Sequence, residues 1–177
     1  IARFSQKEYA SAVADFRRGL ELSPRDTGLQ YNLSIALLQD KKYAAADSAA
    51  TELLQIDPKN KDAYRVLAQS ALERKDTITA TRQVDTLLAQ DSAYIPAYLL
   101  RAQIAAERKD YPTSIRAIDR VLALDAGDAS LYVNRAIMRY HLNDLRGAMS
   151  DYTEALRLEP RDRAALNNRA LLRSQVG

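Results

Sequence analysis

The chain has 177 residues, of which 47% are hydrophobic, and its 26 Lys and Arg against 23 Asp and Glu give a formal net charge of +3. Because this small excess is spread along the chain, it argues against nucleic acid or an anionic membrane as the partner. The sequence has no cysteine, which excludes disulfides and thiolate metal sites, and no apolar run approaches the roughly 18 residues that span a bilayer.

Helical periodicity and helix breakers predict eleven helices. In residues 27–60, apolar residues recur at helical spacing from Tyr31 to Leu38, and a second such pattern runs from Tyr43 to Ile56. Pro58 lacks an amide donor and disfavours helical geometry in the residue before it, so the second helix ends there. The same order of elements repeats, and the predicted helices cover residues 1–6 (truncated), 8–22, 28–40, 43–56, 62–74, 77–90, 96–108, 111–124, 129–142, 145–158 and 163–176.

Small residues recur every 34 positions in two parallel series. One series is Ser34, Ala68, Ala102, Ala136 and Ala170, and the other is Ala12, Ala46, Ala80, Ser114 and Ala148. A fixed period of this size indicates a stacked repeat protein. Because the loops are short, paired helices are antiparallel, and small residues let their backbones approach closely. The sequence therefore predicts an all-α solenoid of antiparallel helix hairpins.

Residues 129–162 carry the pattern most completely, with Tyr132, Ala136, Ala148, Tyr152 and Pro160. In these residues the chain resembles the tetratricopeptide repeat, and the resemblance covers nearly its whole length. It implies an α-α superhelix in a single domain, 1–177, made of a half repeat over 1–26, repeats over 27–60, 61–94, 95–128 and 129–162, and a half repeat over 163–177. Because both ends fall partway through a repeat, we expect a fragment of a longer array.

Residues suited to catalysis are scarce. His141 is the single histidine, which excludes two-histidine metal motifs, and there is no cysteine nucleophile. The five glycines are too dispersed to form a phosphate-binding loop. We therefore expect no catalytic, cofactor or metal site in these residues. An enzyme would need a catalytic domain elsewhere, so a regulatory arm of a larger enzyme stays an alternative.

By the resemblance, the first helix of each repeat lines a concave groove, and family members generally act as protein-interaction scaffolds. The residues expected to face the groove are Tyr31, Ile35, Arg65, Gln69, Glu73, Leu99, Gln103, Glu107, Val133, Tyr140 and His141, together with Leu38, Gln39, Leu72, Ile137, Asn167, Leu171 and Gln175. The lining is apolar, then charged and amide-rich, then apolar again, which suits a peptide with hydrophobic anchors around a polar middle.

Within this lining, Tyr31, Arg65, Gln103 and Tyr140 are the preferred contact residues. Some of the others, Leu38, Leu72 and Ile137, have packing between neighbouring first helices as an equal alternative. For His141 the choice lies between a ligand contact with weak pH dependence and an ordinary solvated histidine, and the second is favoured.

Some family members hold the acidic tails of chaperones in a clamp of Lys, Asn and Arg side chains. Asn32, Asn134 and Asn168 each occupy the central Asn position of this clamp, but their neighbours do not supply the other required residues; before Asn134, for example, stand Leu99 and Gln103. The pattern argues against chaperone-tail docking of this type.

A row of arginines also recurs with the repeat, at Arg101, Arg135 and Arg169, with Arg139 and Arg173 one turn further on. Such a row is one way to follow the phosphates of RNA, which makes a nucleic-acid binder an alternative function. Packing of the arginine stems, with the heads paired to acids such as Asp119 or Asp151, is the favoured interpretation.

The ends of the chain predict one more contact. Apolar faces around Phe4 and around Leu172 and Val176 would lack the neighbours of an intact array, so end-to-end self-association through these cut ends is expected as an artefact that becomes weaker when the chain is extended. The repeats, including residues 145–148, resemble those of bacterial tetratricopeptide proteins of the cell envelope, which favours the periplasm or envelope over the cytoplasm.

Overall fold

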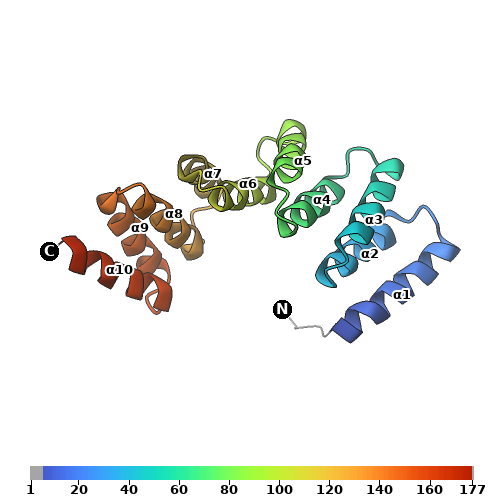
Figure 1. Ribbon diagram of the computed structural model, residues 1–177, viewed down its shortest axis with the longest axis horizontal. Coiled ribbons are helices and arrows are strands. Elements are labelled where there is room, and N and C mark those ends of the chain that lie inside the picture. The colour runs from blue at the N-terminus through green and yellow to red at the C-terminus, as the bar shows by residue number, and fades with distance from the viewer. Residues whose placement is uncertain (1–5, 177) are drawn as a thin grey trace. The chain divides into compact units, whose positions relative to one another are not determined.

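The computed structural model describes the backbone of residues 6–176 and the side chains of residues 8–175. This part of the chain forms ten α-helices and no strand, as the all-α prediction requires. The helices are α1 (Gln6–Leu22), α2 (Thr27–Gln39), α3 (Tyr43–Ile56), α4 (Lys61–Glu73), α5 (Thr77–Gln90), α6 (Ile95–Glu107), α7 (Tyr111–Leu124), α8 (Ala129–His141), α9 (Leu145–Leu158) and α10 (Arg163–Val176), shown in Figure 1.

Most helix boundaries agree with the prediction to within one residue. The helices α3, α5, α7, α9 and α10 begin and end where expected, while α2, α4 and α6 lie one residue earlier and α8 ends one residue earlier. The first described helix begins at Gln6 rather than at residue 8. The helix predicted over residues 1–6 lies, apart from Gln6, outside the described residues.

The turn inside each complete hairpin uses a residue with left-handed backbone geometry. The four such residues are Lys41, Lys75, Lys109 and Asn143, with φ of 59°, 64°, 58° and 61°. In the first turn, the Lys41 amide donates to the Leu38 carbonyl at 3.0 Å and the Lys42 amide to the Leu37 carbonyl at 2.9 Å. These two bonds form a Schellman motif, which satisfies the last carbonyls of α2 and lets α3 begin at once.

The two series of small residues meet inside the hairpins, as predicted. Ala68 and Ala80 are fully buried, as are Ala136 and Ala148. In the α6–α7 hairpin the Ser114 hydroxyl donates to the Ala102 carbonyl at 2.9 Å, so the two backbones approach closely there. The hairpin contact therefore depends on side chains with almost no volume.

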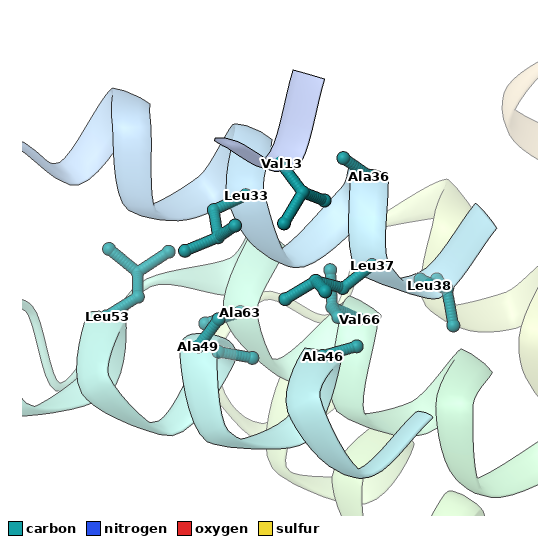
Figure 2. Packing of buried hydrophobic residues seen from close by; sticks show 11 residues of the cluster. Val13, Leu33, Ala36, Leu37, Leu38, Ala46, Ala49, Leu53, Ala63 and Val66 are labelled. Atoms are coloured by element: carbon teal, nitrogen blue, oxygen red, sulfur yellow. The ribbon is translucent and has the colours of Figure 1, made fainter. Parts of the chain in front are cut away.

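Larger side chains pack between consecutive hairpins. Figure 2 shows Leu33 and Leu37 of α2 with Ala46 of α3 and Val66 of α4, all buried in one apolar cluster. Val13 brings α1 into the same cluster. Burial of apolar surface in such clusters is the main favourable term in folding.

The chain divides into two compact units, one ending at Tyr94 and the other beginning at Ile95. This division falls at the junction between the repeats 61–94 and 95–128, so it does not cut through a hairpin. The assignment of all 177 residues to a single domain, and the superhelical winding, stay predictions. Among the described helices, none has both the length and the apolar character needed to cross a membrane.

Candidate functional site

In the first unit, two preferred contact residues are bonded to each other. Arg65 on α4 donates from Nη2 to Tyr31 Oη on α2 at 2.6 Å, and its guanidinium carbon lies 5.9 Å from the centroid of the Tyr31 ring. Asp62, one turn earlier on α4, accepts hydrogen bonds from Arg65 at 3.3 Å. This bond links the first helices of neighbouring repeats, because the two residues are 34 positions apart.

The other predicted residues of this unit also have partners within the chain. Gln69 Nε2 donates to Glu73 Oε1 at 3.0 Å, and Ile35 packs against the apolar cluster beneath it. Glu73 is exposed and Gln69 half-buried. The surface formed by α2 and α4 is therefore polar, and a ligand would have to compete with these internal hydrogen bonds.

Three residues that the sequence analysis did not single out extend this polar surface. Lys61 Nζ lies 2.6 Å from Asp91 Oδ2 and 5.2 Å from the centroid of the Tyr94 ring. The hydrogen bond from Lys61 lowers the pKa of Asp91, and burial raises the pKa of Tyr94. Lys61 and Asp91 are 30 positions apart, so a search at the 34-residue period has no signal for this pair.

In the second unit the predicted residues fall into two groups. Leu99, Gln103 and Glu107 are exposed on α6. Val133, in contrast, is only 7% exposed and belongs to the apolar core between α8 and α9. We leave Val133 out of the candidate surface because its side chain has almost no area to offer a ligand.

The α8–α10 cavity, as we call it, lies in the second unit and has a volume of about 370 Å³. It is lined by Ile137, Tyr140, His141, Tyr152, Asn168, Leu171, Leu172 and Gln175. Tyr140 and His141 are predicted groove residues, and Ile137, Leu171 and Gln175 belong to the wider predicted lining. None of the eight is acidic or a lysine or arginine, and ligand pockets commonly combine such apolar walls with a few polar groups.

Tyr152 of α9 lies at the buried side of this cavity, with 4% of its surface exposed. Burial raises the pKa of Tyr152, while a side-chain hydrogen bond with Asn168 on α10 acts in the opposite direction. A tyrosine phenol is already neutral at physiological pH, and the raised pKa of Tyr152 moves it further from ionising. The cavity therefore has an uncharged floor, and Leu171 and Tyr140 at its edge are 55% and 41% exposed.

His141 stands at the edge of the same cavity in a stack of rings. Its imidazole lies parallel to the Tyr111 ring of α7, with centroids 4.7 Å apart and an interplanar angle of 9°. The Tyr140 ring meets it edge-on at 6.0 Å. Such contacts restrict aromatic side chains in position, so His141 is an ordered part of the cavity wall as well as an exposed residue.

Two members of the arginine row, Arg135 and Arg139, are paired with acids. Arg135 donates to Asp151 from Nη2 at 2.7 Å and Nε at 3.0 Å, and from Nη1 to Asp119 at 2.6 Å. Arg139 Nη1 reaches the same Asp151 at 2.9 Å. Burial opposes the charge of Arg135, but the two acids outweigh it and raise its pKa. The predicted pairing is confirmed for both arginines, which weakens the nucleic-acid alternative.

A larger cavity of about 570 Å³ lies among α1, α2 and α3 in the first unit. Its walls include the small residues Ala45, Ser48 and Ala49 of α3, and charged side chains of both signs, Arg17 and Glu52, stand at its margin. Gln30, which is buried beside it, donates to Glu52 at 2.7 Å. Glu52 is thus already paired within the chain, and the cavity margin carries charges of both signs, so this cavity supports an uncharged anchor less well than the α8–α10 cavity does.

No group of three or more His, Asp or Glu side chains within the described residues is arranged to hold a metal ion. The expectation that this chain has no catalytic or cofactor site, and the expected absence of a chaperone-tail clamp, stay predictions.

Comparison with protein families decides the identity of the repeat. One tetratricopeptide repeat profile matches residues 100–176, and a second profile of the same description matches residues 3–70. The chain is a tetratricopeptide repeat protein. No curated protein matches the sequence.

Solved structures of tetratricopeptide proteins share the fold. MamA 41-end from Desulfovibrio magneticus RS-1 has a TM-score of 0.77 at 18% identity, over 88% of each chain. TTC0263, a thermophilic tetratricopeptide protein of Thermus thermophilus, has a TM-score of 0.72 at 21% identity, over 94% of this chain and 91% of its own. YrrB, described as having an unusual peptide-binding site, has a TM-score of 0.73 at 16% identity, over 93% and 84%. At these identities the likeness shows the fold.

Proposed function

We propose that this chain is a non-catalytic protein-interaction scaffold that binds a peptide segment by taking an uncharged apolar side chain into the α8–α10 cavity. Membership of the tetratricopeptide family and the repeat fold support the general role of a protein-interaction scaffold. The structural neighbour YrrB is described as having an unusual peptide-binding site, which supports the choice of a peptide as ligand.

The observation that carries the proposal is the composition of the cavity wall. Two exposed apolar side chains, Tyr140 and Leu171, lie on first helices of consecutive repeats and line one hollow. Apolar surface held open to water gains free energy when a ligand covers it. A charged ligand side chain would lose its hydration there without gaining an opposite charge, so an aliphatic or aromatic anchor is favoured.

Two amides at the cavity give the peptide backbone its partners. Asn168 and Gln175 both line the cavity from α10. An amide side chain has donors and an acceptor, so it can pair with the N–H and C=O of an extended segment. The proposed ligand is thus a short segment with one apolar anchor, oriented by hydrogen bonds to α10.

The test starts from a peptide library displayed on phage and selected on the full chain. Selected peptides should share an aliphatic or aromatic residue at one position. By calorimetry, Tyr140→Ala and Leu171→Ala should each weaken such a peptide by roughly tenfold or more, the loss of a central anchor contact. Leu124→Ala and Ile78→Ala are matched controls, because these residues are 50% and 81% exposed and do not line the cavity.

Thermal unfolding of every variant separates binding from folding. We expect Tyr140→Ala and Leu171→Ala to unfold near the wild-type temperature and to lose only affinity for the peptide. Selected peptides that bind both variants as tightly as the wild type would show that the cavity is not the site.

A further inference from the structure

The floor of the α8–α10 cavity carries a polar group that the proposed function does not use, the hydroxyl of Tyr152. This residue lies on α9 with 4% of its surface exposed, and it lines the cavity. Burial has the largest effect on the pKa of Tyr152, and the side chains of Asn168 and Tyr140 also affect it. Both of these residues line the cavity, from α10 and α8. The phenol oxygen of Tyr152 therefore lies on the cavity side of its ring.

The oxygen of this hydroxyl accepts a hydrogen bond, whereas its proton has no acceptor in the chain. Burial raises the pKa of Tyr152 and the hydrogen bond with Asn168 opposes that rise, so the bond favours the ionised phenol. Such a bond is made to the oxygen, with the amide of Asn168 as the donor. Among the residues that the structure describes, none accepts a hydrogen bond from the Tyr152 hydroxyl. A ligand that supplies an acceptor here satisfies a nearly buried donor.

The other cavity walls restrict which side chain can bring this acceptor. Ile137 and Leu172 give the cavity apolar surface, and none of its eight lining residues is acidic or a lysine or arginine. A carboxylate would accept the hydrogen bond, but it would lose its hydration without meeting a cation. Serine, threonine and the amide side chains accept a hydrogen bond but have little apolar surface to cover these walls.

Among the large uncharged side chains, tyrosine fits this cavity best. Phenylalanine and the aliphatic side chains have no acceptor, a thioether accepts only weakly, and an indole N–H is a donor only. A tyrosine ring is apolar, its phenol is neutral at physiological pH, and its oxygen accepts a hydrogen bond. The Tyr140 ring, which is 41% exposed at the cavity edge, offers it an aromatic contact.

We propose that the anchor of the α8–α10 cavity is a tyrosine side chain, whose phenol oxygen accepts a hydrogen bond from the Tyr152 hydroxyl. This inference rests on the proposed function, because it names the side chain that the same cavity takes. Tyr152 then determines specificity, since it favours a tyrosine anchor over a phenylalanine anchor that covers the same apolar surface.

Two capped amino acids test the tyrosine anchor without a selected peptide. N-acetyltyrosinamide and N-acetylphenylalaninamide present the two side chains on the same backbone, and NMR titration of the full chain measures both dissociation constants. The tyrosine compound should bind the wild type about tenfold more tightly, because the phenylalanine compound makes no hydrogen bond with Tyr152. In Tyr152→Phe this preference should vanish, so that the phenylalanine compound binds at least as tightly as the tyrosine compound.

The controls separate this hydrogen bond from a purely structural role of Tyr152. The phenylalanine compound should bind Tyr152→Phe as it binds the wild type, whereas a structural role would weaken both compounds alike. Tyr132→Phe is the matched variant, since Tyr132 packs against the same apolar core and does not line the cavity. It should keep the wild-type preference for the tyrosine compound.

Four results would overturn the tyrosine anchor. They are no binding of the tyrosine compound, equal affinity of the two compounds for the wild type, a preference that survives in Tyr152→Phe, and an equal loss of both compounds in that variant. The proposed function fails by a different result, namely selected peptides that bind Tyr140→Ala and Leu171→Ala as tightly as the wild type.

Discussion

The hairpins α2–α3 and α8–α9 have the same backbone contact and opposite chemistry at three equivalent positions. In the first unit these positions are Leu33, Leu37 and Ala49, all buried in an apolar cluster (Figure 2). In the second they are Arg135, Arg139 and Asp151, joined by three hydrogen bonds of 2.7 to 3.0 Å. The repeat therefore fixes which positions meet, and leaves open whether apolar contact or ion pairing joins them.

The two solutions have different consequences. An apolar contact is non-directional and is sensitive mainly to lost volume. A buried ion pair contributes little net stability when intact, but it is costly to break, because the remaining charge has neither water nor a partner. We therefore expect a single substitution among the polar residues to destabilise the α8–α9 hairpin more than one among the apolar residues destabilises α2–α3. Replacement of all three polar residues together should be tolerated.

The largest effect is expected from Asp151→Ala, which leaves Arg135 and Arg139 without their shared acid. We expect the free energy of unfolding in urea to fall by about 3 to 4 kcal/mol, the lower part of the range for a broken buried pair, because Arg135 keeps Asp119 as a partner at 2.6 Å. Glu154→Ala is the control, since it breaks an exposed pair with Arg157 on the same helix and should change stability little. A loss in Asp151→Ala no larger than in the control would show that the network is not desolvated.

In the apolar hairpin, Leu37→Ala should cost about 3 kcal/mol, the combined loss of transfer free energy and the cavity left behind. Leu37 is 2% exposed, whereas Leu22, the control, is 84% exposed and should tolerate alanine. Urea denaturation of both variants measures the difference. Equal stability of Leu37→Ala and Leu22→Ala would contradict the packing in Figure 2.

Replacing the whole polar set sharpens the comparison most. The triple variant Arg135→Leu, Arg139→Leu, Asp151→Ala copies the α2–α3 hairpin, and we expect it to be more stable than the wild type by about 1 to 2 kcal/mol. This is the reverse of the single substitution at Asp151. A triple variant that is less stable than Asp151→Ala would mean that the two hairpins do not share a geometry.

The same two hairpins differ at the start of their second helices. The side chain of Asp144 caps α9 by accepting from the Gly147 amide at 2.9 Å, whereas α3 follows Lys42 and has no side-chain cap. Asp144→Ala removes this cap and should therefore destabilise the chain by about 1 kcal/mol in thermal or urea unfolding. The control is Ser150→Ala on the same helix, an exposed residue that caps no helix and should change stability little.

The smallest effect concerns pH. Helices α5 and α7 are capped by the carboxylates of Asp76 and Asp110, which can take up a proton, whereas α3 has no side-chain cap. The hydrogen bonds from Thr113 lower the pKa of Asp110 from 3.8. A lowered folded pKa gives stability above the unfolded pKa, and this stability is lost as pH falls through the folded pKa. Compared with Asp110→Asn, the wild type should lose stability below about pH 4, and parallel curves for the two proteins would contradict the assignment.

Much of the fold could be predicted from the sequence because the repeat determines the backbone. The 34-residue period placed Ala136 against Ala148, and Pro58 ended a helix where expected. The pairing of Arg135 with Asp151 could also be predicted, since an arginine at a packed position needs an acid nearby. Side-chain periodicity is sufficient for contacts within one hairpin.

Contacts between neighbouring helices were harder to predict. The hydrogen bond between Arg65 and Tyr31, and the burial of Val133, depend on rotamers and on the exact spacing of adjacent first helices, which a repeat pattern does not report. The left-handed geometry of Lys41 was also missed, because glycine is the usual signal for that position. The α8–α10 cavity combines residues of three helices. The predicted groove residues lie only on the first helices of the repeats, so they included residues of α8 and α10 but not Tyr152 of α9.

The most direct test of the functional account is a crystal structure of this chain with a selected library peptide. The account predicts that an aliphatic or aromatic side chain of the peptide lies in the α8–α10 cavity, between Tyr140 and Leu171 and above Tyr152. A peptide seated elsewhere, with water alone in the cavity, would contradict it.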